Sequence, residues 1–285
     1  MVIFLNSMLI QYKSDLKEYL NKLNSKKLAL IPTMGALHEG HISLVEKAKT
    51  LTQDVVVSIY VNPRQFGPGE DLDTYPRSLK RDFDILSKLD VRAVFAPNNE
   101  EIYPEGYQTY VYNSKISRDL CGASRSSHFQ GVCTIVLKLI NLIKPKWILF
   151  GKKDYQQYKI IEQMINDLDL DTKIVAGELI RDSRGLALSS RNSRLNEKEA
   201  ELALSLYHTL KLGKEMVSKG ERDPKYLLDF LKERLMAIDG ISLDYLEMRN
   251  ADDLVKSNPK TILDSILFGA IKIGTTRLID NMPLS

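Results

Sequence analysis

The chain has 285 residues, of which 44% are hydrophobic and 27% are charged, an ordinary composition for a globular protein of one large or two modest domains. Its net charge of +3 comes from 40 basic and 37 acidic residues, a balance that argues against nucleic acid as the main partner. The two cysteines, Cys121 and Cys133, provide neither a disulfide framework nor a metal-binding quartet, and they favour a reducing cytoplasm.

The apolar segments do not predict insertion into a membrane. Residues 1–10 are apolar but lack the basic start and small-residue cleavage site of a signal peptide, so we expect a strand there and keep a targeting segment as the alternative. The most apolar later segment, 132–150, is interrupted by lysines, by Asn141 and by Pro145 too often to span a bilayer. We therefore expect no membrane partner.

Runs typical of strands alternate with runs typical of helices along the first 180 residues. In chain order the expected elements are strand 28–31, helix 42–51, strand 55–61, helix 77–89, strand 93–95, helix 132–143, strand 147–150, helix 155–168 and strand 174–175. Uniformly apolar strands that alternate with helices predict an α/β fold, with a parallel sheet and helices on both of its faces.

The character of the sequence changes near residue 180. Residues 181–192 are polar, and a helix is expected to begin after Asn196, which has Glu199 three residues later as in a capping box. Segments 241–248 and 271–274 resemble strands of a smaller α/β unit. We therefore expect two domains, residues 1–179 and residues 180–285.

The most informative segment is Pro32-Thr33-Met34-Gly35-Ala36-Leu37-His38-Glu39-Gly40-His41, between an expected strand and an expected helix. A helix N-terminus presents unpaired N–H groups and a positive dipole end to an anion, and Gly40 lets a phosphate approach the backbone. Histidine N–H groups at the same place are able to bond nucleotide oxygens. The spacing is one residue too short for the His-Glu-x-x-His zinc motif, which excludes that metalloprotease class. The segment predicts nucleotide binding; the alternative is two surface histidines that cap a helix.

Three further polar segments are candidates for chemistry, and each has a structural alternative. Residues 62–67 follow a strand and include Gln65, a neutral amide suited to hydroxyl and carboxylate groups, but they also suit a plain turn. Residues 151–157 place two lysines at a strand end, although Asp154 and Gln157 have the spacing of a capping box. Residues 188–192 offer hydroxyls and Arg191 for phosphates, or form an ordinary linker. Residues 125–131 are treated as a helix entry with Ser127 near the cap.

In this order, the segments 32–41, 58–67, 71–77, 128–132, 151–157 and 188–192 resemble those of the pantothenate synthetase family, the ATP-dependent pantoate–β-alanine ligases. The resemblance implies a Rossmann-like parallel sheet with a smaller C-terminal α/β lid domain. It implies condensation of pantoate with β-alanine through pantoyl adenylate, with ATP as substrate and Mg²⁺ carried by the ATP rather than by protein side chains. A homodimer in the cytoplasm is expected.

The resemblance also implies roles for single residues. His41 is expected to be the proton donor and His38 to help hold the phosphates, with Lys153 and Arg191 as the other catalytic residues. Pantoate is expected beside Pro32, Met34, Gln65, Phe150 and Gln157, and β-alanine beside Asn62 and Gln65.

ATP is expected along three segments, with Ile180 near the adenine. The expected ATP-binding residues are Met34, Gly35, Ala36, Leu37, His38, Glu39, Gly40, His41, Gly151, Lys152, Lys153, Asp154, Leu188, Ser189, Ser190 and Arg191. Lys152 stands where the family usually has glutamate, and Leu188 where it usually has methionine. Both positions flank the reacting groups, so we expect the reaction itself to be unchanged.

Two alternatives to a ligase stay open. An adenylyltransferase that moves AMP onto a phosphorylated acceptor shares the His-x-Gly-His turn, but the paired glutamines favour a carboxylate and hydroxyl substrate. A nucleotide-binding module without catalysis has no need of Lys153, Arg191 and both histidines together.

Overall fold

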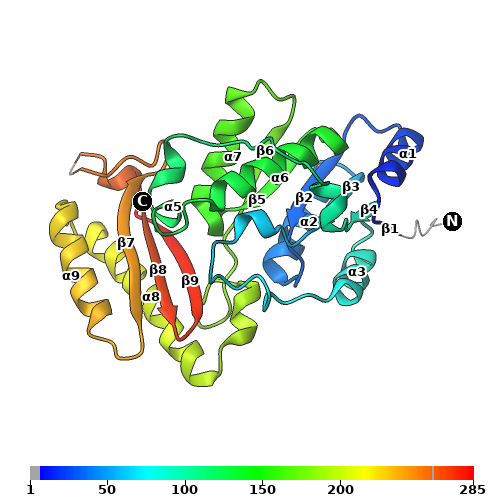
Figure 1. Cartoon of the computed structure of the whole chain (residues 1–285). Coiled ribbons are helices and arrows are strands. Elements are labelled where there is room, and N and C mark those ends of the chain that lie inside the picture. The colour runs from blue at the N-terminus through cyan, green and yellow to red at the C-terminus, as the bar shows by residue number, and fades with distance from the viewer. Residues whose placement is uncertain (1–6, 259) are drawn as a thin grey trace. The chain divides into compact units, whose positions relative to one another are not determined.

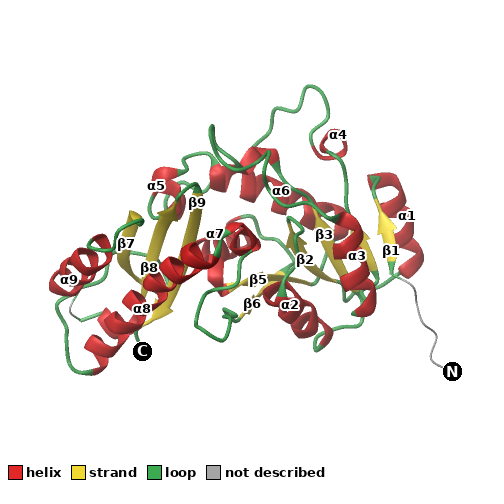
Figure 2. Cartoon of the chain, turned by 90° about the horizontal axis from the view of Figure 1, so that it is seen from below, coloured by secondary structure: helices red, strands yellow, loops and turns green. Residues whose placement is uncertain are grey.

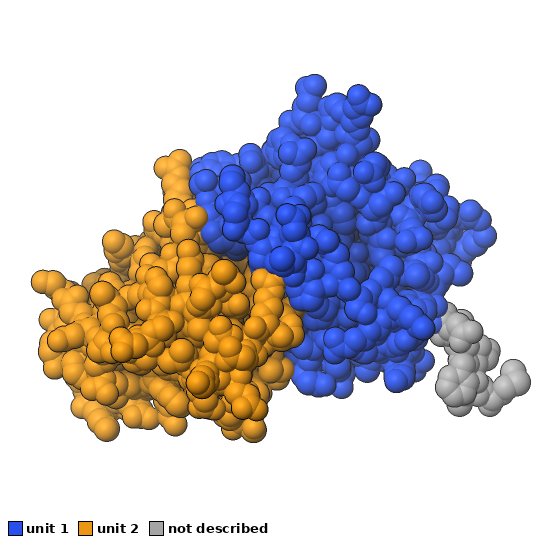
Figure 3. All heavy atoms as spheres, turned by 60° about the horizontal axis from the view of Figure 1, so that its bottom comes forward, with its two compact units in different colours: residues 1–114, 125–152, 160–178 blue, residues 115–124, 153–159, 179–285 orange. Residues whose placement is uncertain are grey.

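The computed structural model describes residues 7–258 and 260–285, which fall into two compact units. The first unit comprises residues 1–114, 125–152 and 160–178, and the second comprises residues 115–124, 153–159 and 179–285 (Figure 3). The short segments 115–124 and 153–159 thus group with the C-terminal residues. The functional division into a substrate-binding domain, 1–179, and a lid domain, 180–285, stays a prediction.

The first unit is built on a six-stranded parallel sheet, as expected (Figure 1). The strands lie in the order β1-β4-β3-β2-β5-β6, and their bounds are β1 Met8–Ile10, β2 Ala29–Thr33, β3 Val55–Ile59, β4 Ala93–Phe95, β5 Trp147–Gly151 and β6 Lys173–Gly177. The segment 1–10 expected as a strand is described only from residue 7. Because β2 lies between β3 and β5, the carboxyl ends of these three strands meet at one edge of the sheet, where the crossover direction changes and ligands bind in such folds.

Helices cover both faces of this sheet (Figure 2). On one face α2 (Glu39–Lys49) and α3 (Leu79–Lys88) bury Leu44, Val45 and Leu86 against alternate strand residues such as Ile31 and Val57. On the other face lie α6 (His128–Ile143) and α1 (Lys13–Leu23), which pack against one another. The other helices before residue 180 are α4 (Asn99–Ile102), α5 (Cys121–Ser124), which belongs to the second unit, and α7 (Tyr155–Asp167), whose first residues also belong to it.

The second unit contains a three-stranded antiparallel sheet in the order β7-β8-β9, formed by Ser242–Asn250, Ser265–Ile273 and Thr276–Pro283. Helices α8 (Glu197–Ser218) and α9 (Pro224–Met236) pack on it through a leucine-rich core. Leu120 and Tyr155, from the two short segments of this unit, pack with Phe268 in a separate cluster. The sheet is therefore covered by apolar contacts from more than one part of the chain.

Most differences from the expected elements lie at their ends. Helix α2 begins at Glu39 rather than residue 42, because His38 caps it. Helix α8 begins after Asn196, whose side chain and that of Glu199 form the expected capping box. The expected strand 271–274 is the end of the longer β8, which Gly274 connects to β9. Helices α1 and α9 and strand β9 were not expected.

Candidate functional site

The turn between β2 and α2 has an unusual backbone path. Gly35 and Ala36 both have left-handed conformations, with φ of 79° and 51°. The N–H groups of Ala36 and Leu37 donate to the two carboxylate oxygens of Asp82, over 2.8 and 2.9 Å. Asp82 lies on α3 and is fully buried. A carboxylate distant in sequence therefore fixes the turn from which the two histidines follow.

The two histidines are held by hydrogen bonds to the start of α2. The Nδ1 atom of His38 accepts from the N–H of Gly40 at 3.1 Å, and Nδ1 of His41 accepts from the N–H of His38 at 3.3 Å. A backbone N–H only donates, so each Nδ1 lacks a proton and each neutral ring carries its proton on Nε2. The ring centroids lie 4.1 Å apart. The arrangement gives a pair of imidazoles in one fixed tautomer.

The structure also gives a different reason for Gly40 from the one that the sequence suggested. A Cβ atom at this position would lie 2.9 Å from Cε1 and 3.0 Å from Nδ1 of His38. The missing side chain thus makes room for the His38 ring. The N–H groups of His38, Gly40 and His41 have acceptors within the turn itself, so these expected phosphate donors take part in the fold.

Gln65 ends a short 3-10 helix, Pro63–Gln65, that follows β3, and its side chain is nearly buried. Its Oε1 accepts from Nδ2 of Asn62 at 3.2 Å, and its Nε2 donates to the sulfur of Met34 at 3.0 Å. Asn62 is itself fixed by Tyr103, whose hydroxyl donates to Asn62 Oδ1 at 3.0 Å, and burial raises the pKa of Tyr103 well above its usual value. The expected pantoate residues Gln65 and Met34 are therefore in contact, and the Gln65 amide has a defined orientation.

The backbone of this short helix rests against helix α6 at Gly131. A Cβ at Gly131 would lie 2.3 Å from the carbonyl oxygen of Arg64 and 2.6 Å from the nitrogen of Gln65. The sequence reading treated residues 125–131 as a helix entry, and Ser127 does occupy the N-cap position, without a side-chain capping bond. The glycine has the further role of letting the loop that carries Gln65 approach the helix.

His128 and Arg125 hold the main-chain carbonyl of Gln65. His128 Nδ1 lies 2.8 Å from this oxygen, and Arg125 donates to it at 3.3 Å. Arg125 also forms a two-pronged ion pair with Glu70, with its Nε 2.8 Å from Oε1 and its Nη2 2.5 Å from Oε2. The sequence predicted a helix entry for Arg125 and His128 but no part for them in the site, although a charged and polar run stands immediately before an apolar helix there.

Phe150 and Gly151 end strand β5, next to β2, and Phe150 is buried. Lys152 follows directly and pairs with Glu178 at 2.9 Å. These residues lie at the same sheet edge as the end of β2, since β5 is the neighbour of β2. The structure therefore brings Pro32–His41, Asn62–Gln65 and Phe150–Lys152 to the same edge of the first unit.

The other expected residues belong to the second unit. Lys153 lies 3.8 Å from Asp154 through Nζ, its side chain is 19% exposed, and its carbonyl accepts from Nδ2 of Asn281 at 2.9 Å. The segment from Ile180 to Leu188 folds back on itself, with the Leu188 N–H donating to the Ile180 carbonyl at 3.0 Å.

This folded-back segment is anchored to β9 by Arg181. The guanidinium of Arg181 binds both carboxylate oxygens of Asp280, at 2.6 and 2.9 Å. Just after the segment, the Ser189 hydroxyl accepts from the N–H of Arg191 at 3.3 Å and caps a short 3-10 helix, Ser190–Arg194. Gln157 lies half-buried on α7. The expected ATP-binding residues of this unit therefore lie in segments that are fixed by local hydrogen bonds and by the Arg181–Asp280 ion pair.

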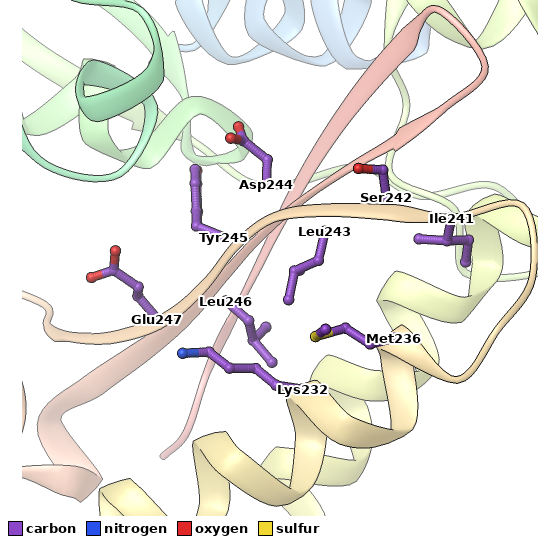
Figure 4. Close-up of a pocket in the computed structure, with 9 residues that line it drawn as sticks. All are labelled: Lys232, Met236, Ile241, Ser242, Leu243, Asp244, Tyr245, Leu246 and Glu247. Carbon is purple, nitrogen blue, oxygen red and sulfur yellow. The ribbon is translucent and has the colours of Figure 1, made fainter.

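Within the part of the chain that the structure describes, one cavity borders the expected residues, and another lies away from them. A cavity of about 550 Å³ in the first unit is lined by Met34, Gly35 and Asp82, among others. The second, of about 600 Å³, lies beside β7 and α9 in the second unit (Figure 4). It is lined by Lys232, Met236 and the segment 241–247, none of which belongs to the expected site.

Across residues 7–258 and 260–285, no group of three or more His, Cys, Asp or Glu side chains has the arrangement of a metal site. In the same part of the chain, no helix combines the length and the apolar character that a membrane crossing requires.

Comparison with known proteins adds to this geometry. A family model described as pantoate-beta-alanine ligase matches residues 8–283. The pantothenate synthetase of Thermosipho africanus is 44% identical over 91% of this chain and 93% of its own length. That of Carboxydothermus hydrogenoformans is 46% identical over 94% of this chain and 96% of its own length.

Solved structures agree with the sequence matches. The pantothenate synthetase of Thermus thermophilus superposes with a TM-score of 0.91, at 36% identity, and covers 97% of this chain and 99% of its own. A pantoate-beta-alanine ligase of Francisella tularensis, complexed with beta-gamma ATP and beta-alanine, matches with a TM-score of 0.80 at 35% identity, over 98% of each chain. On the strength of its sequence matches, its fold and its histidine turn, the chain belongs to the pantoate–β-alanine ligase family.

Proposed function

We propose that this pantoate–β-alanine ligase activates pantoate as an acyl adenylate before β-alanine attacks. A carboxylate is a poor electrophile, so an amine does not displace its oxygen unaided. One carboxylate oxygen of pantoate attacks the α-phosphorus of ATP, and pyrophosphate leaves. The unprotonated amine of β-alanine then attacks the acyl carbon, AMP leaves with the carboxylate oxygen that it received, and the nitrogen releases one proton to water. No protein nucleophile is required, and catalysis consists of positioning and charge stabilisation.

The observation that carries the proposal is the fixed tautomer of the paired histidines at the carboxyl end of the central strand. With both Nδ1 atoms accepting from the backbone, the hydrogen-bond donor of each neutral ring is its Nε2–H group. Such donors, together with the positive end of the helix dipole, stabilise negative charge that develops on a phosphate. We assign His41 as the donor of its Nε2–H proton in a hydrogen bond to the reacting phosphate, without transfer of that proton, and His38 to the other phosphate oxygens.

Pantoate suits the other polar groups at this sheet edge. The amide of Gln65 is neutral and fixed through Asn62, and its nitrogen faces the Met34 sulfur, a weak acceptor that a substrate oxygen would replace favourably. Pro32, Phe150 and Gln157 complete the proposed pantoate site, and Asn62 with Gln65 is proposed to receive β-alanine. The support for these roles is the neutral, nearly dry environment of the amide pair.

For ATP we propose the segments 34–41, 151–154 and 188–191, with Ile180 near the adenine. Lys153 and Arg191 would offset charge on the phosphates, since a cation close to a phosphate oxygen lowers the free energy of the charged transition state. Mg²⁺ is proposed to enter with ATP, held by phosphate oxygens, where it supplies electrostatic screening. A lid role for residues 180–285, a homodimer and a cytoplasmic location are further proposals. The last is supported by Cys121 and Cys133, which are both free thiols.

The reaction is tested by measuring AMP release from the purified chain with ATP, pantoate and β-alanine, omitting each substrate in turn. We expect stoichiometric AMP and pantothenate only when all three are present. Transfer of AMP onto a phosphorylated acceptor, with no dependence on β-alanine, would support the adenylyltransferase alternative. Binding of ATP without any AMP release would support a module that only binds nucleotide.

Replacing Gln65 by alanine should raise the dissociation constant for pantoate much more than that for ATP. Loss of a hydrogen bond to a charged group costs about 1.5–3 kcal/mol, equivalent to roughly a 10- to 100-fold weaker complex. The two dissociation constants are measured by isothermal titration calorimetry, with Gln163→Ala, an exposed glutamine on α7, as the control. Equal losses for pantoate and ATP would contradict the assignment of Gln65 to pantoate.

A further inference from the structure

We propose that Asp82 is a positioning residue for the two histidines: its carboxylate fills an anion-binding concavity in the Gly35–Leu37 turn and so fixes the start of α2. The inference rests on the proposed function, because it assigns the histidines a part in adenylate formation. Asp82 lies on α3. It accepts hydrogen bonds from the N–H groups of Ala36 and Leu37, which lie 46 and 45 residues earlier in the chain.

The turn has the geometry of a backbone anion site. Two successive N–H groups, from Ala36 and Leu37, point at one carboxylate, each at its own oxygen. Successive N–H groups next to left-handed residues form concavities that bind anions in many proteins. Here the anion belongs to the protein, and Asp82 is fully buried with both oxygens engaged. The two N–H groups therefore serve the fold, and the concavity is closed to phosphate.

The hydrogen bond to Asp82 holds the residue next to the two histidines. Leu37, which donates to Asp82, immediately precedes His38, the N-cap residue of α2. On the other side of the turn, the Gly35 N–H donates to the Thr33 hydroxyl at 3.2 Å, and Thr33 donates to the Ser58 carbonyl at 2.7 Å. The turn is thus tied to both α3 and β3, and releasing Asp82 frees its histidine-bearing end.

The space around Asp82 is tight on the side of the turn, and the residue borders a cavity of the first unit. A Cβ at Gly35 would lie 2.9 Å from Oδ2 of Asp82, so only glycine fits against the carboxylate at this distance. Asp82 also lies on the wall of the cavity of about 550 Å³ that Met34 and Tyr60 line. A small carboxylate from solution is therefore able to reach the site when the side chain is shortened.

The first test replaces Asp82 by alanine and measures pantoate-dependent AMP formation. We expect kcat to fall by about a hundredfold, the effect of misplacing reacting groups by about 1 Å, while KM for pantoate changes little, because Gln65 is held by other contacts. Asp84→Ala is the matched control, since Asp84 is an exposed aspartate on the same helix. A wild-type chain that forms no AMP would refute the proposed function. A wild-type chain that is active, together with an Asp82→Ala variant as active as Asp84→Ala, would refute only this inference.

The second test restores the missing anion. Sodium formate added to Asp82→Ala is expected to raise kcat at least about tenfold, a modest part of the hundredfold loss, by occupying the two N–H groups. Sodium chloride at the same ionic strength should have no such effect, and neither salt should raise the kcat of Asp84→Ala. If formate fails to raise the kcat of a folded Asp82→Ala, the carboxylate does not act as a positioning anion.

Asp82→Asn keeps the test decisive if the alanine variant does not fold. Asparagine has the same shape and retains one acceptor oxygen, but its NH₂ group opposes one of the two backbone N–H groups. We expect a lower unfolding temperature, because one buried N–H group loses its acceptor, together with a reduced kcat and no response to formate, because the amide already occupies the space. An asparagine variant with the wild-type kcat would overturn the inference.

Discussion

Replacing Lys153 by alanine is expected to slow the first-turnover release of pyrophosphate by about a hundredfold or more, as the loss of one preorganised charge-stabilising contact does. The side chain of Lys153 is 19% exposed, so most of its surface is shielded from water, where a charge has a stronger effect on a transition state. Its backbone is fixed by Asn281, which donates to the Lys153 carbonyl at 2.9 Å. Rapid-quench measurement of pyrophosphate from ATP and pantoate, without β-alanine, isolates this step.

The control for this experiment is Lys225→Ala, which removes an exposed lysine from the first turn of α9 in the same unit. It should leave the pyrophosphate burst at the wild-type rate. A Lys153→Ala variant with an unchanged burst would show that Lys153 does not stabilise the adenylation transition state, even if its affinity for ATP is reduced.

Replacing Gly131 by alanine is expected to produce the second large effect, a fall in kcat/KM for pantoate of about 10- to 100-fold with a smaller change for ATP. The new Cβ would overlap the carbonyl of Arg64 at 2.3 Å, so the short helix that carries Gln65 has to move. Overpacking of this kind costs about 1–3 kcal/mol, so the unfolding temperature should also fall by several degrees. Steady-state kinetics at varied pantoate and calorimetric unfolding measure the two effects.

Asn141→Ala, at an exposed position on the same helix, provides the comparison for Gly131→Ala. It should keep the wild-type kcat/KM. If Gly131→Ala lowered stability but left kcat/KM for pantoate unchanged, the Gln65 loop would be shown to tolerate displacement, and its proposed role in binding pantoate would be in doubt.

The first unit was largely predictable from sequence because its strands are buried on both faces. Val55 to Val57 and Ile148 to Leu149 are uniformly apolar and fully buried, which is the pattern that predicts a parallel sheet. The polar segments after β2, β3 and β5 were also recognisable, since glycine, proline and histidine interrupt the apolar pattern abruptly. The strand order then brings those segments to a common edge.

The residues that support this edge could not be predicted in the same way. Asp82 occurs on the apolar face of α3, but its partners are 45 and 46 residues away, and sequence spacing alone does not identify them. Gly131 resembles any glycine near a helix start until the close approach of Arg64 is known. Strand β9 buries the polar residues Asp280 and Asn281 and leaves Ile279 half-buried, so its sequence lacks the apolar alternation that predicts a strand.

The transfer of a labelled oxygen tests the adenylate most directly. Pantoate labelled with ¹⁸O in its carboxylate is incubated with ATP, β-alanine and the chain, and the products are analysed by mass spectrometry. The proposed reaction places one labelled oxygen in the phosphate of each AMP and leaves the other in the amide carbonyl of pantothenate. Label in pyrophosphate or orthophosphate, or AMP without label, would contradict attack of the pantoate carboxylate on the α-phosphorus.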